Sequence, residues 1–182
     1  MKNKINKQIK QRVYRYLRCL RIYDKYDKGF EKVFCRNIKG KEEIFLFKPF
    51  FHESPRHGVL VFEVAEYLKQ YTKKVKTYLS VKPDIVFEIN NKEFAVEIET
   101  GVILKKNKKQ LLNKVENLRE NYKRNWFFVI TDRNLVKSYK RYGKTYTKRN
   151  VLRKIDKIMW KEGVNKKEKS GENQAVECEN IF

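Results

Sequence analysis

The chain has 182 residues, with 44 Lys and Arg against 22 Asp and Glu, which gives a formal net charge of +22 at pH 7. This length allows one domain with its own core plus a small appendage, and it excludes a large multidomain enzyme. Because 41% of the residues are hydrophobic and only 7 Gly and 3 Pro occur, the composition also excludes a disordered basic tail. The excess positive charge indicates a polyanion as the partner.

The cysteine pattern and the hydropathy indicate where the protein works. Three well-separated cysteines and two histidines, with no Cys-x-x-Cys pair, argue against a disulfide framework or a structural zinc site. The longest apolar run, residues 126–130, is far shorter than the roughly 20 residues of a membrane span. The Lys-rich start has no following apolar segment of the kind that a signal peptide contains. We therefore expect a cytoplasmic protein that makes no membrane contact.

The first 50 residues are predicted to form a basic helix and a β-hairpin. Apolar residues at 5, 9, 13, 17 and 20 predict one stripe of a helix over residues 3–23. Its basic faces are either simply solvated or make phosphate contacts, and both interpretations stay open. Two β-rich runs, 32–36 and 44–47, flank a turn at Lys39-Gly40 and predict the hairpin. The phosphate-contact candidates in this appendage are Lys7, Lys10, Arg15, Arg18, Lys39 and Lys41. A basic helix followed by a hairpin partly resembles the recognition helix and wing of a winged-helix DNA-binding domain.

Residues 51–160 are predicted to form an α/β core, a small central mixed sheet flanked by helices. The apolar periodicity predicts helices at 59–71, 104–123, 133–141 and 148–160, and strands at 84–89, 93–99 and 126–131, with an early strand at 75–79. From residue 161 the periodicity stops, and residues 161–182 are expected to be a disordered tail.

The stretch from 82 to 101 carries the most chemical information. If Asn90-Asn91 form a two-residue hairpin loop, paired positions sum to 181, and Asp84 faces Glu97. Strand alternation places Glu99 on the same sheet face as Glu97. A four-residue loop would instead set Asp84 opposite Glu99, and a three-residue loop would break the arrangement.

Three converging carboxylates repel one another, so a positive group must lie among them. Mg²⁺ or Mn²⁺ suits oxygen ligands and also binds phosphate oxygens. In a chain of charge +22, such a site makes chemical sense if basic surfaces hold nucleic acid while the metal activates water at one phosphodiester.

At these residues the sequence resembles the PD-(D/E)xK, or restriction-endonuclease-like, nuclease superfamily. Pro83-Asp84 and Glu97 match its motif, and Glu99 stands where the motif has lysine. The resemblance implies that Asp84, Glu97 and Glu99 are metal ligands or catalytic groups. It also implies a cation displaced from the motif, foremost Lys109, with Lys105 and Lys106 as neighbouring nucleic-acid contacts. The helix before the hairpin is expected to add an acid, either Glu63 as a further metal ligand or Glu66, and Gln110 is an accessory candidate.

A narrower resemblance is to the replication-relaxation type proteins of plasmids and mobile elements. Their layout is a winged helix, a helix that begins with His, a Pro-Asp strand and a V-E-x-E strand. His57, Pro83-Asp84 and residues 96–99 match it, over roughly residues 30–131. His57 is accordingly an accessory candidate, although a histidine at a helix start is more often structural.

These observations lead to one functional hypothesis and two alternatives. The hypothesis is a metal-dependent DNA endonuclease of a plasmid, virus or other mobile element, acting on duplex or branched DNA, with a homodimer left open. One alternative is a DNA-binding protein with the same fold and no catalysis; the other is a structural or assembly protein of a mobile element. Pro-Asp pairs and Glu-Ile-Glu runs also occur on ordinary solvated strands, so the motif by itself is compatible with all three.

Overall fold

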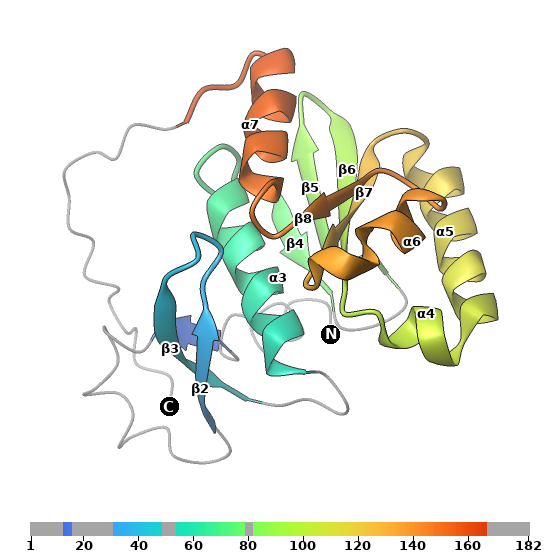
Figure 1. Ribbon diagram of the computed structural model, residues 1–182. Coiled ribbons are helices and arrows are strands. Elements are labelled where there is room, and N and C mark those ends of the chain that lie inside the picture. Colours follow the sequence, from blue (N-terminus) through green and yellow to red (C-terminus); the bar gives the residue numbers. More distant parts are fainter. Residues whose placement is uncertain (1–12, 16–30, 49–53, 79–81, 167–182) are drawn as a thin grey trace, which may run out of the picture.

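The structure is a computed structural model, and it describes residues 13–15, 31–48, 54–78 and 82–166. These residues form an α/β fold with two sheets (Figure 1). The larger sheet is mixed, with strand order β4-β5-β6-β7-β8. The first three strands pair antiparallel, while β6, β7 and β8 are parallel neighbours. Its strands are β4 (Val75–Thr77), β5 (Ile85–Ile89), β6 (Lys92–Glu99), β7 (Trp126–Ile130) and β8 (Thr145–Thr147).

Helices cover both faces of this sheet (Figure 1). The helices are α3 (Pro55–Leu68), α4 (Val102–Lys106), α5 (Lys108–Tyr122), η2 (Arg133–Leu135), α6 (Val136–Lys140) and α7 (Val151–Lys161). One core cluster joins α3 and α7 to the sheet through residues such as Val64, Phe87 and Ile155. A second cluster joins α5 and α6 to the opposite face through Leu111, Phe128 and Tyr139. All five residues of β7 are buried, as expected for a strand covered on both faces. The predicted α/β class and the central mixed sheet are confirmed.

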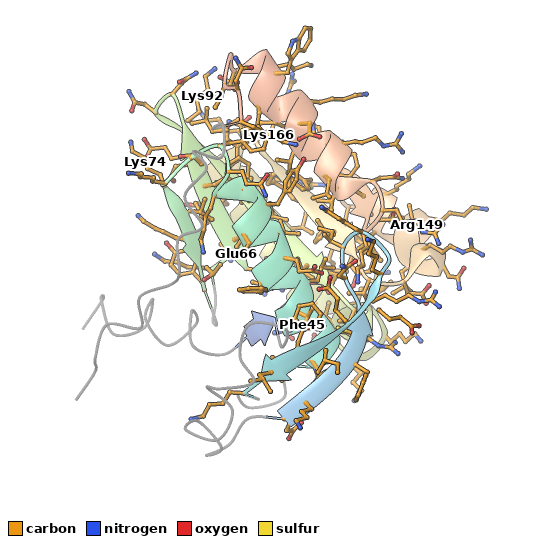
Figure 2. The ribbon with its side chains drawn as sticks, turned by 90° about the vertical axis from the view of Figure 1, so that its left-hand side faces the viewer. Phe45, Glu66, Lys74, Lys92, Arg149 and Lys166 are labelled. Carbon is orange, nitrogen blue, oxygen red and sulfur yellow. The ribbon has the colours of Figure 1, made fainter. Side chains whose placement is uncertain are left out.

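The smaller sheet packs against α3 (Figure 2). It contains β1 (Val13–Arg15), β2 (Glu31–Arg36) and β3 (Glu42–Phe47), in the antiparallel order β1-β3-β2. Phe45 and Phe47 of β3 form a buried cluster with Val59 of α3. The β2–β3 turn, with Gly40 at φ +85°, confirms the predicted hairpin. Ile38 of that turn joins the core of the larger sheet, so the small sheet is packed onto the core.

The predicted N-terminal helix is wrong where the structure describes it. Val13–Arg15 is a strand that pairs with β3, Val13 opposite Phe47. A β-branched and an aromatic residue suit an edge strand, and the apolar Phe45-Leu46-Phe47 run of β3 offers a partner that a helix-period count does not consider. The remainder of residues 3–23, with Lys7, Lys10 and Arg18, lies outside the described residues.

Other predicted elements differ in smaller ways. The predicted helix 104–123 is two helices, because the chain breaks at Asn107, whose side chain caps α5 by accepting a hydrogen bond of 3.0 Å from the Gln110 N–H. The early strand is present as β4, while β8 was not predicted. Beyond α7, Val164 packs on the core, and Lys166 donates a 2.8 Å hydrogen bond to the Tyr67 hydroxyl; residues 167–182 lie outside the described residues. Among the residues described, no helix has both the length and the apolar character needed to cross a bilayer.

Candidate active site

The β5–β6 hairpin sets the positions of the acidic residues. Asn90 and Asn91 both have positive φ, 48° and 59°, and Ile85 pairs with Val96. This is the two-residue loop with positions that sum to 181, so the four-residue and three-residue alternatives are excluded. Glu97 and Glu99 share the face covered by α5, and both are buried, at 3% and 5% exposure. The predicted face and register of the two glutamates are therefore confirmed.

Asp84 lies just before β5 and is fixed by two contacts. Its Oδ2 accepts a 2.7 Å hydrogen bond from the backbone N–H of Ile98, the residue after Glu97. Its Oδ1 lies 3.3 Å from Nε2 of His57. His57 is held at the first turn of α3, where the Ser54 side chain accepts a hydrogen bond from its backbone N–H. The start of α3 and the end of the hairpin thus meet at the Asp84 carboxylate.

A lysine that was not among the candidates completes the cluster. Nζ of Lys114, on α5, pairs with Oε1 of Glu97 and lies 3.3 Å from Oε1 of Glu99. Lys114 follows Leu111 by three residues and precedes Leu118 by four, so it lies in the apolar stripe that packs α5 on the sheet. A lysine at stripe spacing was the signal in the sequence that could have identified it. We call Asp84, Glu97, Glu99 and Lys114 the acid–lysine cluster.

Tyr139 of α6 provides the other contact of Glu99. Its hydroxyl donates a 3.0 Å hydrogen bond to Oε2 of Glu99, and its ring packs edge-on against Phe128 at 5.2 Å between centroids. Glu99 is therefore held at both oxygens, by Lys114 at Oε1 and by Tyr139 at Oε2. The Glu99 carboxylate therefore links Lys114 of α5 to Tyr139 of α6.

Burial and mutual repulsion shift the pKa values of the cluster. Burial, and next the Asp84 carboxylate, raise the pKa of Glu97 to about 8 despite the opposing Lys114 ammonium. Burial also raises the pKa of Glu99, with Lys114 and Tyr139 opposing it. For Lys114, burial lowers the pKa, but the Glu97 and Glu99 carboxylates outweigh it and raise the pKa above its usual value. Lys114 is therefore a cation throughout the neutral range, and one lysine faces three acids.

The remaining candidates lie away from these contacts or on the surface. Glu63 is buried beside Cys35 and Lys148, where α3 faces the small sheet. Glu66 is exposed and pairs with Lys69. The side chains of Lys105, Lys106, Lys109 and Gln110 are exposed on α4 and the first turn of α5. Lys39 and Lys41 are exposed at the hairpin turn, where their backbone N–H groups donate to Asn37 Oδ1, and Arg15 lies in β1.

The carboxylates also indicate what kind of metal site would fit. Across the described part of the chain, no three His, Cys, Asp or Glu side chains are grouped so as to hold a metal ion. A cage made wholly of protein ligands is thus absent there. Asp84 and Glu97 remain as two neighbouring hard oxygen donors whose charges repel. Mg²⁺ is commonly bound through one or two carboxylates and several waters, so the donor set fits Mg²⁺ or Mn²⁺ in that form.

Comparison with known proteins adds no relative: no family model matches the sequence, and no curated protein or solved structure matches it.

Proposed function

We propose that this protein is a metal-dependent nuclease that hydrolyses DNA phosphodiesters at the acid–lysine cluster. The observation that carries the proposal is the contact of the Lys114 ammonium with Glu97, beside Asp84. The PD-(D/E)xK motif needs two acids and a lysine. Position 99 has no lysine, but Lys114 of α5 places its ammonium beside Glu97, the residue that matches the second acid of the motif.

Asp84 and Glu97 are the residues that would hold Mg²⁺ or Mn²⁺, and Glu63 is not assigned this role because it lies beside Cys35 and Lys148, where α3 faces the small sheet. When bound, the ion would polarise the phosphodiester and lower the pKa of a water molecule. Glu97 binds a metal only when deprotonated, so its raised pKa makes metal and proton compete at this carboxylate.

Lys114 acts as a fixed cation in this proposal. Because its pKa is raised, it keeps its proton at neutral pH and is unsuited to accept one from water. It is suited to stabilise the negative charge that develops on the phosphate during attack. Glu97 and Glu99 accept hydrogen bonds from Lys114, Tyr139 fixes Glu99 in turn, and His57 orients Asp84.

The surroundings of the cluster suit a polyanionic substrate. The chain leaves β6 at Glu99 and enters α4, so exposed Lys105, Lys106 and Lys109 follow directly from the acidic end of the sheet. With a net charge of +22, long-range attraction to DNA is expected, with an affinity that falls as salt rises.

The second candidate function is DNA binding without catalysis. The observation that favours it is that Lys114 already partly neutralises Glu97 and Glu99, so the cluster has a structural explanation without a metal. Both candidates share the fold and the basic surface, and turnover separates them.

The test is incubation of supercoiled plasmid with the protein in Mg²⁺, Mn²⁺ or EDTA. We expect nicking or cutting with either metal and none in EDTA, and loss of activity in Asp84→Asn, Glu97→Gln and Lys114→Met. The matched control is Glu93→Gln, which removes the same charge from an exposed position of β6. Each variant is checked for folding by circular dichroism and for DNA binding by gel shift.

Two outcomes would overturn the nuclease proposal. Cluster variants that cut at the wild-type rate would place the activity elsewhere. A folded wild-type protein that binds DNA but never cuts it would leave the binding function.

The effect of metal on folding is a separate readout. At tenfold saturation Mg²⁺ should raise the free energy of unfolding of the wild type by about 1.4 kcal/mol and that of Asp84→Asn by much less.

A further inference from the structure

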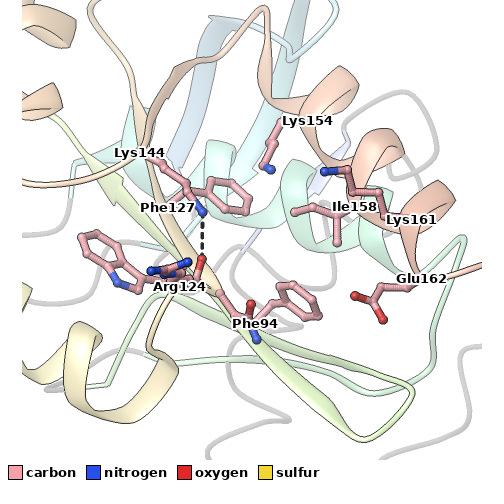
Figure 3. A pocket seen from close by; sticks show the side chains of 10 residues that line it. Phe94, Arg124, Phe127, Lys144, Lys154, Ile158, Lys161 and Glu162 are labelled. Atoms are coloured by element: carbon pink, nitrogen blue, oxygen red, sulfur yellow. Dashed lines mark hydrogen bonds between the residues drawn. The ribbon is translucent and has the colours of Figure 1, made fainter.

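A second feature lies at the opposite end of the large sheet from the acid–lysine cluster. A pocket of about 200 Å³ opens beside Phe94 and Trp126, near the starts of β6 and β7 (Figure 3). Glu97 and Glu99 lie three and five residues beyond Phe94 on β6, about 10 and 17 Å along a strand, and Phe94 projects to the opposite face of the sheet from both glutamates. The pocket is therefore distinct from the acid–lysine cluster.

The rim of this pocket is strongly basic. Arg124, Lys144, Lys154 and Lys161 all line it, and they come from the segments before β7 and β8 and from α7 (Figure 3). Lys144 donates a 3.0 Å hydrogen bond to the Arg124 carbonyl, which ties the two loops together and fixes the position of its ammonium.

The one acid among the lining residues is engaged elsewhere. Oε2 of Glu162 lies 2.8 Å from Nζ of Lys92, at the tip of the β5–β6 hairpin. Four cationic side chains thus line the pocket, and the single carboxylate among the lining residues pairs with Lys92, which is not one of them. Burial lowers the pKa of Lys154, and Lys144, Lys161 and Lys157 lower it further, which reflects their repulsion.

An anion in the pocket would relieve this repulsion. Phe94, Phe127 and Ile158 form an apolar wall beside the cations; Lys154 is half-buried there, and the exposed Arg124, Lys144 and Lys161 remain accessible to a negative group from solvent. The volume is several times the roughly 30 Å³ that one water molecule occupies in the liquid, which is enough for a compact group of several non-hydrogen atoms.

We propose that this pocket binds a phosphate group, through Lys154 and Lys161 of α7 with Lys144 and Arg124. The phosphate belongs either to a nucleic-acid strand or to a free polyphosphate or nucleotide. Lysine and arginine side chains are the usual donors to both. The proposal is independent of the acid–lysine cluster and needs no catalysis there.

The chain provides a local reporter for the test. It has two tryptophans: Trp126 lines the pocket, while Trp160 is 78% exposed on α7. A Trp160→Phe background leaves Trp126 as the single tryptophan, so its fluorescence reports binding at the pocket. Titrations with inorganic pyrophosphate, ATP and a short single-stranded oligonucleotide are run in EDTA at fixed ionic strength, so that no metal binds and electrostatic screening stays constant.

We expect a saturable change in Trp126 fluorescence that weakens about tenfold or more when Lys154→Gln and Lys161→Gln are combined, because two charge-assisted contacts are lost. The matched control combines Lys73→Gln and Lys76→Gln, two exposed lysines at the β4 edge of the sheet, and should leave the affinity unchanged.

The probes distinguish the source of the phosphate. Binding of pyrophosphate and ATP supports a free phosphate compound, and binding of the oligonucleotide alone supports a strand. The proposal is overturned if no probe gives a saturable change, or if the pocket and control variants weaken binding equally. Neither result depends on whether the protein cuts DNA.

Discussion

Nζ of Lys114 lies 3.3 Å from Oε1 of Glu99, which stands where the PD-(D/E)xK motif that the sequence resembles has lysine. In the proposed nuclease site, a lysine from α5 thus provides a positive charge beside Glu97, and the Glu99 carboxylate accepts a hydrogen bond from that lysine. Tyr139 fixes the other oxygen of Glu99, so α5, β6 and α6 are joined at one buried point.

The first prediction is that Lys114→Met destabilises the protein as well as abolishing cleavage. Removal of the ammonium leaves two buried carboxylates without their cation. Loss of one partner of a buried pair costs about 3–5 kcal/mol, and the partial exposure of Lys114 reduces this to about 2–3 kcal/mol. Urea unfolding at pH 8.5 measures the loss.

The control for this prediction is the pair of variants Lys114→Met and Glu97→Gln in a double-mutant cycle. The double variant should lose less free energy of unfolding than the sum of the losses in the two single variants, because the neutral amide at position 97 no longer needs the cation. The loss from Lys114→Met should also shrink at pH 6, where Glu97 is protonated more readily. Simple additivity at both pH values would contradict the proposed pairing.

The second prediction is that Glu99→Lys, which restores the motif's lysine in the sequence, damages the protein. The new ammonium would face Lys114 and the Tyr139 hydroxyl, both of which donate to the present carboxylate. We expect a loss of about 3 kcal/mol or more, from like-charge repulsion and a lost buried hydrogen bond, with no gain in cleavage. Glu99→Gln, which keeps an acceptor, should lose less. Thermal melts and plasmid cleavage of both variants decide this, and an active, stable Glu99→Lys would contradict it.

The hairpin that carries the acids was predictable because its information is local. Asn90-Asn91 tolerates the positive φ values of a two-residue turn, that turn fixes the register, and alternation then fixes the face of Glu97 and Glu99. The helix–strand order of the core followed in the same way from apolar periodicity.

The contacts around the hairpin were not predictable, because they depend on how distant elements dock. Lys114 is 15 residues from Glu99, and Tyr139 is 40 residues away. Whether either reaches the carboxylate depends on the angle and rotation of α5 and α6 on the sheet. The strands β1 and β8 have three residues each, too few to show a period, and they exist because β3 and β7 offer them an edge.

The third prediction concerns the pH dependence of stability without metal. The pKa of Glu97 is raised from 4.5 to about 8 in the folded protein, mainly by burial. Between these values the folded state holds the proton more tightly than the unfolded state, so this group lowers the free energy of unfolding as pH rises. The slope is at most about 1.4 kcal/mol per pH unit, and it vanishes above the folded pKa.

Comparison with Glu97→Gln isolates this contribution from those of other groups. Urea unfolding in EDTA at several pH values from 5 to 9 should show the wild type losing stability relative to the variant up to about pH 8, followed by a constant difference. Parallel curves over the whole range would show that Glu97 titrates normally.

The last prediction concerns Gly101, which turns the chain from Glu99 into α4. Its φ is +90°, and a Cβ there would lie 2.3 Å from Cδ1 of Leu135. Gly101→Ala therefore combines backbone strain with a steric clash.

Gly40 is the matched control, because its φ is +85° and a Cβ there would have no heavy atom within 4 Å. We expect Gly40→Ala to cost about 1–2 kcal/mol from strain, and Gly101→Ala to cost about 1–2 kcal/mol more. In the double variant Gly101→Ala with Leu135→Ala, that excess should disappear while the strain remains, because only the clash involves the leucine. Urea unfolding of these three variants and of Leu135→Ala alone measures each part, and equal costs at Gly101 and Gly40 would show that Leu135 moves aside freely and does not brace the turn after Glu99.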